Sequence, residues 1–140
     1  MCLHSSQVFS KYVGLKYADK GRTEKGFDCW GLARHIYKEE LGIILPSFTD
    51  SYSTSETREE IAAIIEFQKM KWEAIPSGKE QPFDIILLRI LGFPMHIGVV
   101  IEKRKMIHVF KGSNTTIENY TSAQWRHRVL GFYRYKEGIR

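Results

Sequence analysis

The sequence predicts an α+β fold in a single domain, on three observations. The chain has 140 residues, 43% of them hydrophobic, which is enough for one core. Helical patterns come first, and segments rich in β-branched and aromatic residues follow. That order is typical of helices packed on a mainly antiparallel sheet. No repeat or long linker divides the chain, so we expect residues 1–140 to form one domain.

Three helices are predicted, and the second carries a cysteine at its start. A short helix runs from Ser5 or Ser6 to about Val13, and Tyr17–Asp28, without periodicity, is expected to be a loop. Asp28 then caps a helix over Cys29–Leu41 that ends at Gly42. Its hydrophobic residues recur at helical spacing, so Cys29 lies at the top of the buried face. A capping pattern predicts a third helix over Thr57–Met70.

Five strands are predicted after these helices because β-branched and aromatic residues dominate five separate segments. The segments are Phe83–Leu91, His96–Glu102, Lys105–Lys111, Asn114–Tyr120 and Arg128–Tyr135.

Composition excludes several classes of protein. The apolar runs are short and broken by charge, so no membrane span is expected, and the first residues lack a secretory signal, so we expect synthesis in the cytoplasm. Cys2 and Cys29 are too few for a disulfide framework. The net charge of +5 favours polyanions, but a solvated surface is its plainer explanation, and without a binding motif we expect no nucleic-acid partner.

The position of Cys29 at a helix start gives it a specific chemistry. The first turn has unpaired N–H groups and the positive end of the helix dipole, which favour a thiolate. The thiolate is the nucleophilic form of cysteine, and the same N–H groups can hold an oxyanion. We therefore expect Cys29 to be a thiolate nucleophile, with Asp28 opposing it unless that carboxylate caps the helix or binds substrate.

Two of the five histidines are candidates for the partner of this cysteine. His4 lies near the terminus, His35 on another side of the helix, and His127 in a basic surface stretch. His96 and His108 lie on consecutive predicted strands. Either one alone is more often structural, but the pair suggests a base, His96, oriented by His108.

The turn between these two strands decides whether the histidines share a face of the sheet. A three-residue turn at Glu102–Arg104 would place His108 opposite Gly98 and diagonal to His96, about 7–8 Å away. A two- or four-residue turn would place the histidines on opposite faces. Cys29, His96 and His108 could also hold a catalytic zinc ion, but the helix-start cysteine favours a nucleophile, and we expect no metal or other cofactor.

The sequence resembles the NlpC/P60 family of papain-like cysteine peptidases, and more narrowly its phage tail-assembly branch in prophages. The matching stretches are "YADKGRTEKGFDCWGLARHIYKEELGIILP", "DIILLRILGFPMHIGVVI", "MIHVFKGSNTTIENY" and "WRHRVLGFYRY". The resemblance implies a papain-like fold with N-terminal helices packed on a mainly antiparallel sheet of five to six strands. It also implies Cys29 as nucleophile, His96 as base and His108 as the orienting group.

The resemblance extends to the substrate side of the site. It implies that Tyr17 lines the site near the oxyanion and that Asp28 meets a substrate amino group. Trp30 is a third substrate-binding candidate, although packing is its plainer role. The sequence departs from the common family pattern at Trp30 and Met95, where many members have serine, and at Phe83, where many have glycine.

Family members hydrolyse amide bonds of peptidoglycan stem peptides, typically between γ-D-glutamate and a diamino acid, so the resemblance implies this activity and phage tail proteins as partners. The missing secretory signal places the protein in the cytoplasm on synthesis, and the resemblance suggests a virion tail as a later location. Two alternatives stay open. One is a non-catalytic tail-tip subunit that keeps the scaffold, which the bulky Trp30 and Met95 would favour. The other is an intracellular amide or thioester hydrolase.

Overall fold

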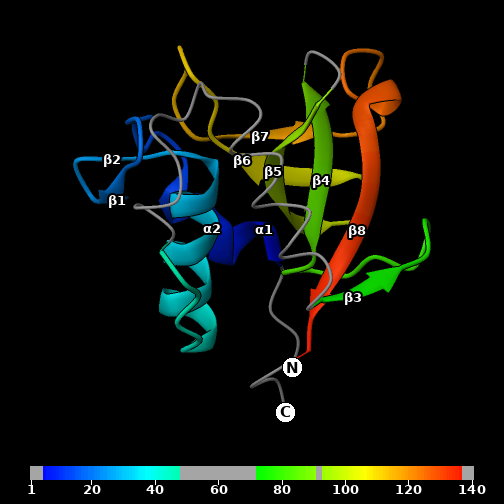
Figure 1. Cartoon of the computed structure of the whole chain (residues 1–140), viewed down its shortest axis with the longest axis horizontal. Coiled ribbons are helices and arrows are strands. Elements are labelled where there is room, and N and C mark those ends of the chain that lie inside the picture. Colours follow the sequence, from blue (N-terminus) through cyan, green and yellow to red (C-terminus); the bar gives the residue numbers. More distant parts are fainter. Residues whose placement is uncertain (1–4, 48–71, 91–92, 137–140) are drawn as a thin grey trace.

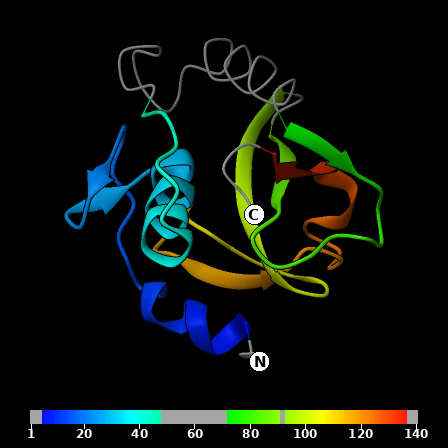
Figure 2. The ribbon, with the colours of Figure 1, turned by 90° about the horizontal axis from the view of Figure 1, so that it is seen from below.

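The computed structural model describes residues 5–47, 72–90 and 93–136, and these form a curled six-stranded sheet with helices against one side (Figures 1 and 2). The strand order is β3–β8–β4–β5–β6–β7, and each pair of neighbours is antiparallel. The expected α+β architecture is therefore confirmed. The helix predicted over Thr57–Met70 lies outside the described residues.

The helices near the N-terminus form where the sequence predicts them. The first is α1 (Ser5–Phe9), which continues as the 3-10 turn η1 (Ser10–Tyr12). The second is α2 (Cys29–Ile36), which continues as a π-helical turn, η2 (Tyr37–Leu41). Asp28 caps α2 by accepting a hydrogen bond from the Gly31 N–H, and Gly42 ends η2 with a φ of 69°, a conformation that glycine adopts readily. A further 3-10 turn, η3, spans Arg126–Arg128.

The five predicted strands are present, and three more segments pair that were not predicted. The expected loop between η1 and α2 contains a small hairpin, β1 (Arg22–Thr23) with β2 (Gly26–Phe27), whose strands are too short to show a period. The strand β3 was missed because its burial does not alternate: its two end residues are buried and its two middle residues exposed. The strands of the large sheet are β3 (Trp72–Ile75), β4 (Ile85–Ile90), β5 (Phe93–Glu102), β6 (Lys105–His108), β7 (Thr116–Asn119) and β8 (Val129–Tyr135).

Both faces of the central strands are buried. Alternate residues of β4, such as Ile85 and Leu87, pack with Leu32 of α2 in one hydrophobic cluster. The intervening residues, such as Ile86 and Leu88, pack in a second cluster with the buried Trp125. Because successive side chains point to opposite faces, a shift of one residue in any pairing would exchange the two clusters.

The β5–β6 hairpin has the predicted register but a different turn. Val99 pairs with Ile107 and Glu102 with Lys105, so that one extra residue bulges from β5 and a two-residue turn, Lys103–Arg104, closes the hairpin. The turn is therefore the two-residue alternative, but the bulge supplies the odd residue that the three-residue turn would have given. His108 consequently lies opposite Gly98, where an added Cβ would be 3.3 Å from the His108 Cβ.

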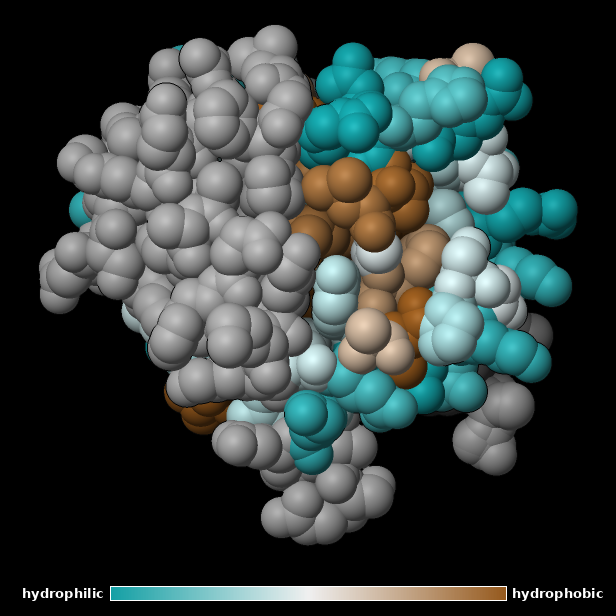
Figure 3. Space-filling model, turned by 45° about the vertical axis from the view of Figure 1, so that its right-hand side comes forward, coloured by the Kyte–Doolittle hydropathy of each residue, from teal (hydrophilic) through white to brown (hydrophobic). Residues whose placement is uncertain are grey.

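The opposite edge of the sheet carries an open hollow. Figure 3 turns this side of the molecule forward and shows hydrophobic residues gathered between hydrophilic ones. Among the residues that line the hollow, one arginine is the only charged side chain. The lining therefore contains no histidine or carboxylate that could act as a base toward a nucleophile. The lining residues are Ala74, Ile75, Ser77, Arg126, Val129, Leu130, Gly131, Phe132 and Tyr133.

The residue before Asp84 and β4 has an unusual backbone conformation. Phe83 has a φ of 76°, in the left-handed region that disfavours residues with a Cβ atom. Its ring packs against the Phe9 ring with 5.0 Å between centroids, and its carbonyl accepts a hydrogen bond from the Tyr37 hydroxyl. Packing therefore stabilises phenylalanine at a position where the backbone favours glycine.

We expect Phe83→Gly to be more stable than Phe83→Ala by about 1 kcal/mol, because both variants lose the ring and only glycine relieves the positive φ. Urea unfolding of the two variants measures this difference. The exposed Ala74 in β3 provides the control, since Ala74→Gly should lower the free energy of unfolding by about 0.5–1 kcal/mol. A glycine variant at position 83 that is no more stable than the alanine variant would contradict the prediction.

Candidate active site

The helix α2 brings the Cys29 thiol to the strand that carries His96. Cys29 is the first residue of the helix and is half-buried. Two backbone N–H groups, that of Trp30 in the first turn and that of Ile97 in β5, act on its sulfur and lower the pKa of the thiol. Ile97 directly follows His96, so the predicted nucleophile lies beside the strand that carries the predicted base.

Burial dominates the protonation of Cys29. It raises the pKa of the thiol to about 12, and the negative charge of Asp28 acts in the same direction. The Ile97 N–H, the Arg22 guanidinium and the Trp30 N–H lower this pKa by less. Desolvation therefore opposes the thiolate that the helix start favours, and the raised pKa predicts a protonated thiol at neutral pH.

His96 and His108 form a buried hydrogen-bonded pair, as the register predicts. His96 Nε2 lies 2.8 Å from His108 Nδ1. Burial, with a contribution from His108, lowers the pKa of His96 well below its usual value. Burial also lowers the pKa of His108, although Glu118 partly offsets it. Both imidazoles are therefore neutral at neutral pH.

A third partner in this row was not predicted. His108 Nε2 lies 2.9 Å from Glu118 Oε2, and the indole N–H of the buried Trp125 donates to Glu118 Oε1 at 2.9 Å. Glu118 pairs with Met106 in the sheet and thus shares a face with His108, two residues further along β6. The strand Asn114–Tyr120 was predicted, and pairing it with the histidine strand would have revealed this acidic residue.

Asp28, a predicted substrate-binding residue, is buried in contacts within the protein. Its Oδ1 accepts from the Gly31 N–H at 2.7 Å and from Arg22 Nη1 at 2.8 Å. Gly31 allows the hairpin to approach closely, because an added Cβ would lie 2.0 Å from the Gly21 carbonyl oxygen. The β1–β2 hairpin is thereby fixed directly against the start of α2.

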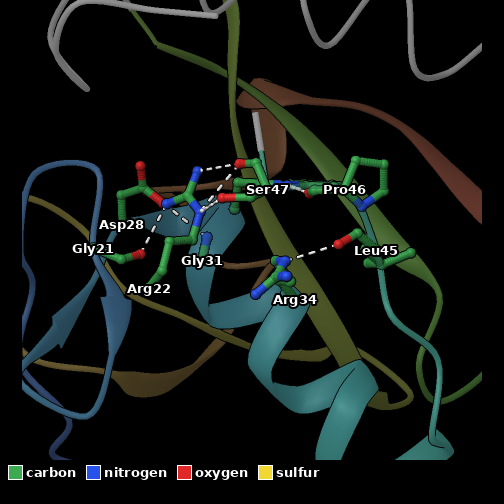
Figure 4. Close-up of polar contacts among 9 residues, drawn as sticks. Gly21, Arg22, Asp28, Gly31, Arg34, Leu45, Pro46 and Ser47 are labelled. Carbon is green, nitrogen blue, oxygen red and sulfur yellow. Dashed lines mark hydrogen bonds and ion pairs between the residues drawn. The ribbon is translucent and has the colours of Figure 1, made fainter. Parts of the chain in front are cut away.

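Three side chains near Cys29 hold the segment Leu45–Ser47 by its backbone carbonyls (Figure 4). Arg34 Nε donates to the Leu45 carbonyl at 2.8 Å, and Trp30 Nε1 donates to the Pro46 carbonyl at 2.7 Å. Arg22 donates to the Ser47 carbonyl through Nε and Nη2, at 3.1 and 2.6 Å. Trp30, predicted on the substrate side, therefore engages its indole N–H in a structural contact, as its packing alternative expects.

The backbone of Tyr17, the remaining candidate, lies close to the start of α2. It forms a parallel bridge with Phe27, two residues before Cys29, and it is half-buried. The side chain of Met95 is outside the described part of the structure. Within that part, no helix is long and apolar enough to cross a membrane, and no three His, Cys, Asp or Glu side chains are arranged to hold a metal ion.

Comparison with solved structures shows the fold. The NlpC/P60 domain of the peptidoglycan hydrolase SagA aligns with a TM-score of 0.64 and 18% identity, over 93% of this chain and 95% of that one. A lipoprotein-like NLP/P60 family protein from Staphylococcus aureus aligns with a TM-score of 0.68 and 20% identity, over 96% of this chain and 41% of that one.

Curated relatives match most of this chain. The murein DD-endopeptidase MepS/murein LD-carboxypeptidase of Escherichia coli K12 is 24% identical over 126 residues, which are 88% of this chain and 58% of that protein. The γ-DL-glutamyl hydrolase of Bacillus subtilis is 24% identical over 133 residues, 92% of this chain and 28% of that protein. This chain thus spans little more than half of the first relative and about a quarter of the second.

The model of the NlpC/P60 family matches residues 14–134, which include the cysteine helix, the two histidine strands and all of β8 but its last residue. The match covers most of the chain and contains Cys29, His96 and His108. This protein therefore belongs to the NlpC/P60 family.

Proposed function

We propose that this protein is a cysteine endopeptidase or amidase that hydrolyses amide bonds of peptidoglycan stem peptides. The observation that carries the proposal is a cysteine at a helix start, next to the strand that carries one member of a buried histidine pair. The names of two relatives, a murein endopeptidase and a γ-glutamyl hydrolase, support peptide bonds of the cell wall as the substrate class.

In the proposed mechanism, Cys29 attacks the carbonyl carbon of the amide while its proton passes to His96. Since thiol and imidazole are both neutral at rest, the proton moves as the carbon–sulfur bond forms. The protonated His96 then gives this proton to the departing amine, leaving a thioester. Water, deprotonated by His96, hydrolyses the thioester and restores the thiol, while His108 holds the His96 ring in place.

On the substrate side, the N–H groups of the first helical turn are proposed to hold the oxyanion, with Tyr17 beside them. Asp28 is proposed to attract a substrate amino group by its charge, because one of its oxygens is already bound to Arg22 and Gly31. Trp30 remains a candidate for contact with substrate through its ring. The γ-glutamyl relative favours the bond between γ-D-glutamate and a diamino acid.

We further propose that the protein associates with a phage or prophage tail, where tail proteins would bring the enzyme to the cell wall. Its support is the sequence resemblance to the tail-assembly branch. Mass spectrometry of tails purified from strains that carry or lack this protein's coding sequence tests whether the protein is a tail component.

The activity proposal predicts that the protein cleaves purified muropeptides and that Cys29→Ser and His96→Ala each lower kcat/KM by at least about 1,000-fold. Liquid chromatography with mass spectrometry identifies the bond that is cut. Matched controls are Cys2→Ser and His127→Ala, the second at an exposed histidine in η3, and both should retain activity. A folded wild-type protein that cuts no muropeptide would favour the non-catalytic tail subunit, and cleavage of other amides or thioesters alone would favour a different hydrolase.

The neutral resting pair predicts slow alkylation of Cys29 by iodoacetamide at neutral pH. Because only the thiolate reacts, the rate should rise about tenfold for each pH unit between pH 7 and 10. The Cys2→Ser variant isolates the Cys29 signal, and a free cysteine derivative, whose rate levels off above its pKa of about 8.5, is the reference. A plateau of fast labelling below pH 7 would instead show a thiolate–imidazolium pair and contradict the neutral state.

A further inference from the structure

The hydrogen-bonded row from Trp125 to His96 has an unambiguous direction. Trp125 Nε1, Glu118, His108 and His96 are joined by three contacts of 2.8–2.9 Å, and the indole and both imidazoles are buried. An indole nitrogen only donates, so Glu118 Oε1 must accept at the first contact. A carboxylate only accepts, so Glu118 Oε2 receives a proton from His108 Nε2.

Glu118 is a carboxylate at neutral pH for a physical reason. Burial alone would raise its pKa, but the Trp125 and His108 contacts hold the pKa below its usual value. His108, which burial keeps neutral, then has its single proton on Nε2 and presents the lone pair of Nδ1 to His96. His96 must therefore donate from Nε2, which leaves Nδ1 without a proton.

We infer that Glu118 is a positioning residue that fixes the tautomer of both histidines and so leaves Nδ1 of His96 as the base. The catalytic consequence rests on the proposed function, whereas the tautomer assignment rests on the three contacts and on an ionised Glu118 beside a neutral His108. The proton of Cys29 has only this nitrogen of His96 to receive it, because Nε2 is committed to His108.

The contact with Trp125 explains why a glutamine at position 118 would not impose the same tautomer on His108. In Glu118→Gln the indole N–H still requires an oxygen, so the amide oxygen faces Trp125 and the amide NH2 faces His108. His108 must then accept at its Nε2 and donate from its Nδ1. His96 in turn must accept that hydrogen bond at its Nε2. Both histidines switch to the Nδ1–H tautomer, and His96 loses its basic nitrogen, although shape and packing are preserved.

Nitrogen-15 NMR of the histidine side chains tests this assignment without any substrate. In the wild-type protein at neutral pH, His96 and His108 should both be Nε2–H tautomers, and in Glu118→Gln both should be Nδ1–H tautomers. Glu80→Gln is the matched control, since Glu80 is also half-buried and accepts from the Tyr120 hydroxyl, and it should keep the wild-type tautomers. Signals are assigned by their loss in His96→Ala and His108→Ala.

Muropeptide kinetics give the second readout. Glu118→Gln should lower kcat by about 100- to 10,000-fold with KM within about twofold, while Glu80→Gln leaves both unchanged. An Nδ1–H tautomer in the wild-type protein, unchanged tautomers in a folded Glu118→Gln variant, or a tautomer switch without loss of kcat would each overturn the inference. A wild-type protein with the expected tautomers but no cleavage would overturn the proposed function and leave the tautomer assignment standing.

Discussion

The register between β5 and β6 is the constraint on which both the core and the site depend. The single bulged residue in β5, together with the two-residue turn, sets which face each later side chain occupies. With that register, Ile107 packs toward the helices and His108 toward Trp125. A slip of one residue would bury His108 under α2 and turn Ile107 to the other cluster. Hydrophobic burial on both faces therefore stabilises the arrangement that also aligns the histidines.

A second requirement is that the start of α2 be held firmly against its surroundings. The buried pair of Arg22 with Asp28 joins the β1–β2 hairpin to the helix cap, and Gly31 permits the close approach. The same arginine reaches the Ser47 carbonyl. A charge pair removed from water is costly unless its hydrogen bonds are satisfied, and here the cap and the carbonyl contacts contribute to satisfying them. Rigidity at the thiol thus comes from polar contacts, not from the helix alone.

The sequence was sufficient to predict features that depend on local pattern. The cap at Asp28 and the stop at Gly42 follow from short-range rules, whereas the shared face of His96 and His108 was left open by the sequence. Three features could not be obtained that way. The first is the bulge in β5, which has the same effect on the register as a three-residue turn. The second is the role of Glu118, which is visible only when β6 is paired with β7. The third is the high pKa of Cys29, which results from burial in the folded protein. Each depends on how separate segments pair or pack in the folded chain, which a pattern within one segment does not show.

The burial of Cys29 also bears on its resistance to oxidation. Peroxides attack the thiolate and convert it to sulfenic acid, and protonated thiols react slowly. A cysteine with a raised pKa, beside a histidine that stays neutral, is therefore spared this damage while the site is empty. In the proposed mechanism, a bound amide draws the proton to His96 as the new bond forms, and only then does the sulfur become strongly nucleophilic. That mechanism would confine the reactivity of the sulfur to the moment at which a substrate occupies the site.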